Sequence, residues 1–284
     1  RYKFSWNPKA VLNNTIAGAR WLENNEMKEI EPGELMDNPL DVNFLPGFSL
    51  EGYPNRDCIA YKDIYKISNA KTIFRGTLRY KGFCDVMKGL QLIGLLSSEA
   101  HPSLHSKGPE ITWRKLLCIL LNQKDDILVS NLKHIIYDIV GSETRANAIE
   151  ELGLLEDEPV FKMFTPIDTL TYYLHNKLAF NQGEKDIIIM RHDIGIEWPD
   201  GAHEVRNIDL VVYGDPYGYT AMAKTVGYPA GIASKMVLNG EIQTKGIVVP
   251  MSSEIYNPML KRLKKEGIVS IEKTKKIKTS LSLP

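Results

Sequence analysis

The sequence has few cysteines, and their spacing excludes several kinds of site. Cys58, Cys84 and Cys118 are the three cysteines in 284 residues, and no two of them form a C-x-x-C motif. Zinc and thiol redox centres commonly use such closely spaced pairs. We therefore expect three free thiols in a reducing compartment.

The sequence also lacks net charge and long apolar runs. Lys plus Arg equals Asp plus Glu at 35 each, so no basic surplus attracts phosphate backbones or anionic membranes. No apolar run approaches the roughly 18 to 20 residues that cross a bilayer, and no charged and then apolar leader opens the chain. We expect a soluble protein that binds neither nucleic acid nor membrane.

Motifs for nucleotide, hydrolytic and metal sites are absent as well. The sequence contains no G-x-G-x-x-G, no G-x-x-x-x-G-K-[ST] and no G-x-S-x-G, which removes a complete nucleotide cradle and the nucleophile elbow. His101 and His105 are four residues apart, but Pro102 argues against the helix that would bring both imidazoles to one metal ion. No metal ligands are predicted.

The length suggests about two domains, and the N-terminal part mixes helix and strand signals. Pro8 is typical of a first helical residue, and apolar residues then recur at helical spacing as far as Asn24. Residues 72–80 alternate like a strand, in which Gly76 marks a bulge or a close backbone approach. Further predicted elements are a strand at 27–32 and a helix at 82–96.

A helical pattern replaces these signals between residues 97 and 159. Helices are predicted at 112–121, 125–140 and 146–155, joined by short polar segments. We interpret 97–159 as a helical subdomain inserted in a mixed-sheet α/β (α+β) domain. Thr165 and Pro166 then begin another helix, with a capping-box variant at its start.

A hairpin and a final helix are predicted in the C-terminal part. Residues 185–198 and 203–213 are rich in Ile and Val, and the turn-forming Pro-Asp-Gly at 199–201 joins them as antiparallel strands. A serine at 252 or 253 caps an amphipathic helix with basic residues near its C-terminal end. The closing segment 273–284 is expected to be a frayed tail.

Arginines in a turn and in the strand at 72–80 are suited to an acidic ligand. Arg56 follows a turn-forming stretch, and Arg75 and Arg79 lie four residues apart on the strand. A guanidinium offers a planar fork of donors that matches a carboxylate. Alternation places Thr77 and Arg79 on one face, so their side chains could reach the same ligand.

A simpler interpretation of the same arginines stays open at this point. Arg56 could pair with Asp57 or Asp63 on the surface. Arg75 and Arg79 could be ordinary charges at a strand edge.

Several strings in the sequence resemble a known enzyme family. They are K-F-S-W-N-P at 3–8, L-E-G-Y-P-N-R-D at 50–57, F-R-G-T-L-R-Y-K-G at 74–82, I-D-L-V-V-Y-G at 208–214 and T-A-M-A-K-T-V-G at 220–227. The chain resembles glutamate-forming saccharopine dehydrogenase, and within that family the C-terminal portion of the bifunctional aminoadipic semialdehyde synthase. One departure is Asn7, where the family more often has Ser.

The resemblance implies an oxidoreductase of lysine degradation. Such an enzyme uses NAD or NADP and water to cleave saccharopine into glutamate and 2-aminoadipate 6-semialdehyde. The implied substrate contacts are Arg56, Thr77, Leu78 and Arg79, whereas Arg75 matches the family string without an expected ligand role. The acid and base residues and the dinucleotide loop are expected upstream of Arg1, so the chain alone is expected to be inactive.

The resemblance also implies a domain layout. Residues 1–96 and 160–214 would form the substrate-binding α/β domain, with 97–159 inserted in it. Residues 215–284 would return to a Rossmann cofactor lobe that is otherwise missing. We further expect a homo-oligomer, in mitochondria if the chain is part of the bifunctional animal-type enzyme and otherwise in the cytoplasm.

Two other functions remain open on the sequence alone. The chain could act as a non-catalytic saccharopine-binding or dimerisation module. It could also belong to a related enzyme such as carboxynorspermidine dehydrogenase, although that substrate has fewer carboxylates for the arginines to bind.

Overall fold

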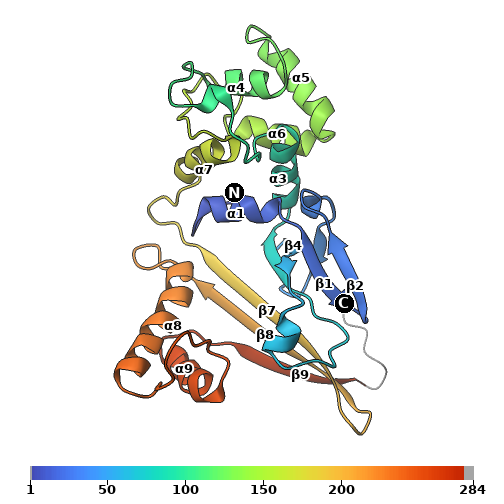
Figure 1. The fold of residues 1–284 in the computed structure, drawn as a ribbon, viewed down its shortest axis with the longest axis vertical. Coiled ribbons are helices and arrows are strands. Elements are labelled where there is room, and N and C mark those ends of the chain that lie inside the picture. Colours follow the sequence, from blue (N-terminus) through green and yellow to red (C-terminus); the bar gives the residue numbers. More distant parts are fainter. Residues whose placement is uncertain (1, 278–284) are drawn as a thin grey trace. The chain divides into compact units, whose positions relative to one another are not determined.

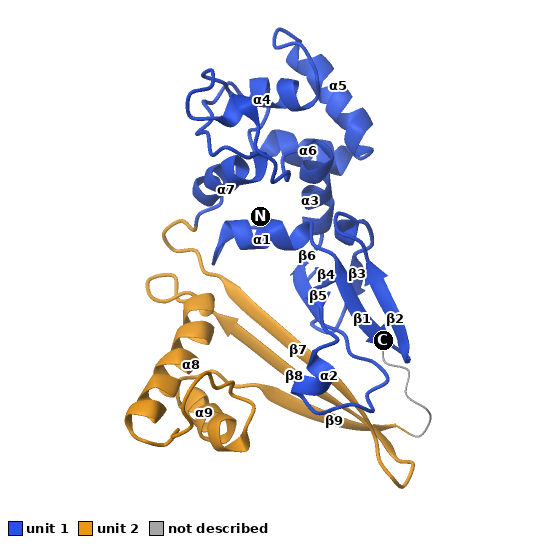
Figure 2. Ribbon diagram, in the orientation of Figure 1, with its two compact units in different colours: residues 1–179 blue, residues 180–284 orange. Residues whose placement is uncertain are grey.

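The computed structural model describes residues 2–277 and divides into two compact units, residues 1–179 and residues 180–284 (Figure 2). Each unit combines helices with three-stranded sheets, which confirms the predicted mixed α/β class (Figure 1). No helix among the described residues is long and apolar enough to cross a bilayer. The layout of 1–96, 97–159, 160–214 and 215–284 stays a prediction.

The first unit begins with a helix that is followed by a hairpin. Helix α1 (Pro8–Thr15) starts where it was predicted, and the Oδ1 atom of Asn7 accepts the N–H of Ala10 at 3.2 Å. Its predicted continuation to Asn24 is wrong, because β1 (Ala19–Glu23) and β2 (Glu26–Ile30) pair antiparallel. The strand predicted at 27–32 thus lies within a hairpin.

The hairpin turn explains the error in helix length. Asn24 and Asn25 both have left-handed backbone angles, with φ of 51° and 65°. Two-residue hairpin turns need this conformation, and asparagine adopts it more readily than most residues. Apolar residues at 19 and 22 fit a helix as well as a strand, so the Asn-Asn turn decides between the two.

One short stretch of chain belongs to two sheets. Strand β4 (Leu50–Pro54) lies between β3 (Leu40–Val42) and β6 (Gly76–Tyr80) in an antiparallel sheet. After Asn55, β5 (Arg56–Asp57) pairs parallel with β1 in the other sheet. The connections include η1 (Leu35–Asp37) and α2 (Tyr61–Ile64).

Gly76 shows the close backbone approach that was expected. The predicted strand at 72–80 becomes regular at Gly76, and Ile73 makes an isolated bridge to Leu22. A Cβ atom on Gly76 would lie 3.2 Å from the carbonyl oxygen of Tyr53 and 3.0 Å from the Phe74 ring. The absence of a side chain therefore lets β4 and β6 pair at this end.

Helices form the rest of the first unit, close to the predicted positions. They are α3 (Phe83–Leu92), η2 (Pro102–Leu104), α4 (Trp113–Leu120), α5 (Val129–Val140), α6 (Glu143–Glu151) and α7 (Pro166–Lys177). Helix α7 begins as predicted, since the Thr165 hydroxyl oxygen accepts the N–H of Asp168 at 3.1 Å. The buried apolar residues of these helices and of α1 form one core cluster, in which Trp113 is the largest fully buried side chain.

The second unit is built on a long hairpin with a third strand added. Strands β7 (Ile187–Glu197) and β8 (His203–Tyr213) pair antiparallel around the predicted Pro-Asp-Gly turn, in which Gly201 has φ of 80°. Strand β9 (Ile271–Ile277) pairs antiparallel with β8. The prediction of a frayed tail is therefore wrong for 273–277, and residues 278–284 lie outside the described part.

Two helices complete the second unit and contact each other. They are α8 (Ala221–Leu238) and α9 (Ser253–Lys265), the latter at the predicted position. The Asp186 carboxylate accepts the N–H groups of Ala221 at 2.6 Å and Met222 at 2.9 Å, so it caps the N-terminal end of α8. This carboxylate fixes the start of α8 beside the first strand of the sheet.

Candidate functional site

The pairing of β4 with β6 decides which predicted site residues share a face. Tyr53 lies opposite Thr77, and Glu51 lies opposite Arg79. Directly opposite residues of an antiparallel pair point to the same face, and successive residues alternate. Thr77 and Arg79 therefore share one face, as predicted from the alternation.

Leu78 projects from the other face of the sheet. It lies opposite Gly52, and a Cβ atom on Gly52 would come within 3.8 Å of a Leu78 methyl group. The side chain of Leu78 therefore cannot share a ligand face with Thr77 and Arg79. Only its backbone reaches that region, where its carbonyl oxygen accepts a hydrogen bond from Arg79.

Arg79 is held by aromatic rings and leaves one edge of its guanidinium without a partner. Its Cζ atom lies 5.1 Å from the ring centroid of Phe83 and 5.8 Å from that of Tyr2. Nη1 donates to the Leu78 carbonyl at 2.9 Å, whereas Nε is buried without a hydrogen-bond partner among residues 2–277. Buried donors are nearly always bonded, so the unpaired Nε is an exception among the described residues.

The carboxylate nearest in the strand register does not neutralise Arg79. Glu51 is buried and accepts the N–H of Cys84 at 2.7 Å and that of Gly82 at 3.1 Å. It therefore caps the N-terminal end of α3, where the helix dipole favours a negative charge. Within the described part of the chain, Arg79 has no ion-pair partner, and its positive charge remains available to an anion.

The phenols and the thiol near Arg79 stay neutral at physiological pH. Burial raises the pKa of Tyr53 to about 12, and the nearby charge of Arg79 offsets part of the rise. Burial also raises the pKa of Tyr2, again against the influence of Arg79. The pKa of the Cys84 thiol is raised by burial and then by the Glu51 charge. No phenolate or thiolate therefore competes for the guanidinium.

Thr77 belongs to a chain of three polar side chains, from α1, from the residue between β4 and β5, and from β6. The Asn55 Nδ2 group donates to the Thr77 hydroxyl oxygen at 2.7 Å. The Asn14 Nδ2 group, on α1, donates to Asn55 Oδ1 at 3.1 Å. The backbone N–H of Asn55 also donates to the carbonyl of Arg75 at 2.8 Å, which ties the end of β4 to β6.

Arg56 lies directly after this network and is exposed. Its φ of 55° is unusual for a residue with a long side chain, and such conformations gather at functional sites. The surface pairing with Asp57 or Asp63 is not observed, since Arg20 binds Asp57 at 3.0 Å and Arg56 has no ion pair within residues 2–277. Its guanidinium is thus free to meet a ligand.

Arg75 differs from the other two arginines. Its Cζ atom lies 5.9 Å from the ring centroid of Tyr61, and its carbonyl accepts the N–H of Asn55. These contacts agree with a structural position rather than a ligand contact.

The sequence reasoning missed the residues that support Thr77 and Arg79. Glu51, Tyr53 and Asn55 lie inside the quoted string at 50–57 without having been singled out. Asn14 carried a usable signal, because it is a polar residue on the buried side of α1 next to Val11 and Leu12. A buried amide of this kind needs a partner, and here the partner is Asn55.

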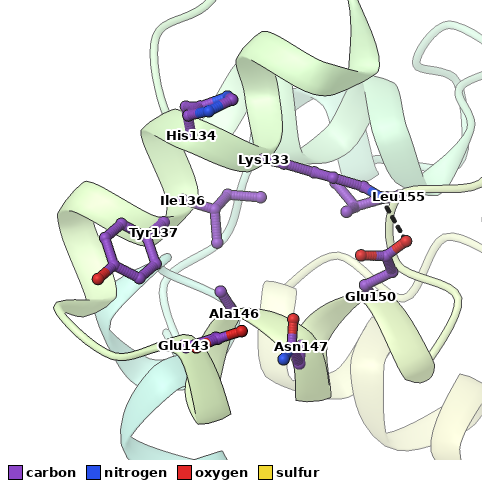
Figure 3. A pocket seen from close by; sticks show the side chains of 9 residues that line it. All are labelled: Lys133, His134, Ile136, Tyr137, Glu143, Ala146, Asn147, Glu150 and Leu155. Carbon is purple, nitrogen blue, oxygen red and sulfur yellow. Dashed lines mark hydrogen bonds and ion pairs between the residues drawn. The ribbon is translucent and has the colours of Figure 1, made fainter.

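A separate hollow lies between α5 and α6 (Figure 3). It has a volume of about 210 Å³ and is open to solvent. Ile136, Ala146 and Leu155 supply its apolar lining, and an ion pair between Lys133 and Glu150 crosses one side. None of its lining residues belongs to the arginine site.

No metal centre is apparent in the part of the chain that the structure describes. Residues 2–277 contain no group of three or more His, Cys, Asp or Glu side chains that could hold an ion. The chemistry that the arginine face offers is the binding and orientation of an anionic ligand.

Comparisons with known proteins agree with the resemblance seen in the sequence. The family model described as saccharopine dehydrogenase C-terminal domain matches residues 1–268. The mitochondrial alpha-aminoadipic semialdehyde synthase of Rattus norvegicus is 44% identical over 271 residues, which cover 95% of this chain and 29% of that protein. The saccharopine dehydrogenase (NADP(+), L-glutamate-forming) of Saccharomyces cerevisiae is 37% identical over 279 residues, which cover 96% of this chain and 62% of that protein.

A solved structure also matches. The apo histidine-tagged saccharopine dehydrogenase (L-Glu forming) from Saccharomyces cerevisiae superposes with a TM-score of 0.87 at 34% sequence identity. The match covers 96% of this chain and 62% of that chain. The chain thus spans less than two thirds of the length of these relatives.

Proposed function

Because this chain belongs to the saccharopine dehydrogenase C-terminal domain family, we propose that it supplies the substrate-binding part of a glutamate-forming saccharopine dehydrogenase. The whole protein would oxidise saccharopine with NAD or NADP and water to L-glutamate and 2-aminoadipate 6-semialdehyde, a step of lysine degradation. The Saccharomyces cerevisiae relative is named for its use of NADP(+) and for glutamate formation, which supports this assignment.

The observation that carries the proposal is that two arginines next to one polar network in the chain have no carboxylate partner among residues 2–277. Among residues 2–277, neither Arg56 nor Arg79 has a carboxylate partner, although the chain contains 35 acidic residues. Asn55 links them, since it precedes Arg56 in the chain and binds Thr77 on the face of Arg79. This arrangement suits an elongated ligand with more than one acid group.

Saccharopine has the charge that such a site requires. It carries three carboxylates, and each charge-assisted hydrogen bond contributes roughly 1.5 to 3 kcal/mol net. Aromatic neighbours reduce the screening of Arg79 by water, which strengthens its attraction for an anion. We assign Arg56, Thr77 and Arg79 to substrate binding through their side chains and Leu78 through its backbone alone.

The residues of this chain do not fit a dinucleotide cradle. No two of its glycines have the G-x-G spacing that lets a backbone approach a pyrophosphate. We therefore assign NAD or NADP binding, and the catalytic acid and base, to a part of the protein outside residues 1–284. The described residues bind and orient the substrate.

The compartment and the assembly belong to the same proposal. The rat relative is named as mitochondrial, so we propose a mitochondrial location for the whole protein, with the cytoplasm as the alternative. We also propose a homo-oligomer that binds neither nucleic acid nor membrane.

The test uses the full-length protein that contains this segment. Purified enzyme is mixed with saccharopine and either NAD or NADP, and cofactor reduction is followed by absorbance together with glutamate release. We expect saccharopine-dependent reduction with one glutamate formed per reduced cofactor. Calorimetric binding of saccharopine without turnover would instead identify a binding module, and neither binding nor turnover would overturn the proposal.

A further inference from the structure

We propose that Asn14 and Asn55 are positioning residues that turn the Thr77 hydroxyl proton toward a carboxylate of the substrate. The inference rests on the proposed function and assigns roles to two residues that touch no ligand themselves. It is carried by the hydrogen bonds from Asn14 to Asn55 at 3.1 Å and from Asn55 to Thr77 at 2.7 Å.

The direction of the hydrogen bonds sets the direction of the Thr77 proton. A threonine hydroxyl has one proton to donate and can accept through its oxygen. Because Asn55 Nδ2 donates to the Thr77 oxygen, that oxygen is used as an acceptor and its own proton points elsewhere. An acceptor within the chain is the buried hydroxyl of Tyr53, directly opposite Thr77, and a substrate carboxylate competes with it as the stronger acceptor. A carboxylate can only accept hydrogen bonds, so this orientation is the one that favours an acidic ligand.

Asn14 determines which end of the Asn55 amide faces Thr77. The Asn14 Nδ2 group donates to Asn55 Oδ1, so the oxygen of Asn55 is held toward α1 and its nitrogen toward β6. The reversed amide would place Asn55 Oδ1 against Thr77 and would draw the hydroxyl proton inward. Asn14 thus controls a hydroxyl that it does not contact.

Asn14 is costly for stability at this position, which supports a role beyond packing. The residue is 9% exposed, and its Oδ1 atom is buried without a hydrogen-bond partner among the described residues. An unsatisfied buried acceptor costs about 1–3 kcal/mol, and an apolar residue beside Val11 and Leu12 would avoid that penalty.

The position of Thr77 relative to Arg79 fits one shared ligand. The two residues lie on one face of β6, two positions apart, which corresponds to about 6.6 Å along a strand. That separation lets a hydroxyl and a guanidinium bind one carboxylate or two neighbouring acid groups. The amide chain therefore adds an oriented neutral donor to a charged one.

The test compares four variants of the full-length enzyme for saccharopine affinity. Thr77→Val removes the hydroxyl at nearly constant shape, and Asn55→Asp replaces the donor with a carboxylate that captures the Thr77 proton. We expect each to raise the dissociation constant and KM about 10-fold, which corresponds to about 1.4 kcal/mol, with little change in kcat. Thr77→Ser retains the hydroxyl and should stay within about twofold of the wild type.

Asn14→Asp is the variant that separates positioning from packing. The introduced carboxylate repels Asn55 Oδ1, so the amide reverses and the Thr77 proton turns inward although Thr77 is unchanged. We expect a loss of affinity similar to that of Asn55→Asp at neutral pH. Affinity should recover toward the wild-type value at acid pH, because protonation restores a donor at position 14.

A double-mutant cycle and the wild-type control make the outcome decisive. Asn55→Asp should add nothing in the Thr77→Val background, since the hydroxyl that it misdirects is already gone. Additive losses of affinity would overturn the inference, and so would wild-type affinity in folded Asn55→Asp and Asn14→Asp proteins. The proposed function would remain intact in either case, provided that the wild-type enzyme turns over saccharopine. If the wild type itself binds no saccharopine, the proposed function fails instead.

Discussion

Replacement of Arg79 tests the proposed site most directly. In Arg79→Gln the guanidinium is lost, while the side chain remains long enough to lie between Phe83 and Tyr2. Because Nη1 is bound to Leu78 and Nε is buried, Nη2 is the guanidinium nitrogen that we assign to a carboxylate. Loss of this charge-assisted contact removes roughly 1.5 to 3 kcal/mol of binding.

The expected magnitude follows from that free energy. At about 1.4 kcal/mol per factor of ten, the KM for saccharopine should rise about 10- to 150-fold in the full-length enzyme. The contact with Phe83 contributes about 0.5–1 kcal/mol to folding, so a modest decrease of the melting temperature should accompany the change. Steady-state kinetics well below the melting temperature separates the two effects.

Arg75→Gln is the matched control for Arg79→Gln. It removes the same charge four residues earlier, from a side chain that contacts the half-buried Tyr61 on α2. Its KM should remain within about twofold of the wild type. High salt should weaken saccharopine binding more in the wild type than in Arg79→Gln, because salt screens the charge of Arg79, which the variant lacks. Equal KM values for Arg79→Gln and Arg75→Gln in an active enzyme would refute the reasoning.

Three further predictions concern the framework of the site. Glu51→Gln keeps the shape of the cap on α3 but removes its charge. The free energy of unfolding, measured by urea titration, should therefore fall by about 1–2 kcal/mol, and an unchanged midpoint would contradict the capping role. Gly76→Val places a Cβ atom 3.2 Å from the Tyr53 carbonyl oxygen, which should push β4 away from β6. The KM for saccharopine should then rise, and a wild-type KM would show that the close approach is dispensable. The pKa of Tyr53 is raised to about 12 from its ordinary value of 10.0, so its contribution to stability is fully present below pH 10 and is lost as the pH rises through 12. Between pH 10 and 12 the free energy of unfolding of the wild type should therefore decline more steeply than that of Tyr53→Phe, by up to about 1.4 kcal/mol per pH unit. Parallel pH profiles of the two proteins would argue against a buried neutral phenol.

Local signals in the sequence predicted the elements whose ends are defined by specific residues. Pro8 and Thr165 mark the starts of α1 and α7, and the Pro-Asp-Gly turn joins β7 to β8. In each case a side chain or a turn residue forms its hydrogen bond within a few positions of itself. Such bonds depend little on the rest of the fold.

The errors occur where the sequence allowed two structures or where a distant strand decides. Residues 19–23 fit a helix and a strand, and the pairing with β2 selects the strand. The basic run at 273–277 has little apolar character, yet β8 recruits it as an edge strand. Lysines are common on exposed edge strands, because they oppose pairing with further chains.

The candidate site was predicted only as far as one strand could reveal it. Alternation gave the shared face of Thr77 and Arg79, because period two is a property of the strand alone. The bond from Asn14 to Asn55 joins residues 41 positions apart, and no local pattern encodes it. The same alternation places Leu78 on the face opposite to Thr77 and Arg79, although the resemblance assigns all three residues to substrate binding.

The membership of residues 50–57 in two sheets has a consequence for how the two arginines are spaced. Arg79 is located by its pairing with β4, whereas Arg56 is located by its pairing with β1, and a single residue, Asn55, connects the two strands. The spacing of the two arginines along the backbone therefore depends on one connecting residue. Inserting one residue beside Asn55 would shift Arg56 relative to Arg79, so this junction is where the proposed site could be adapted to a substrate of another length.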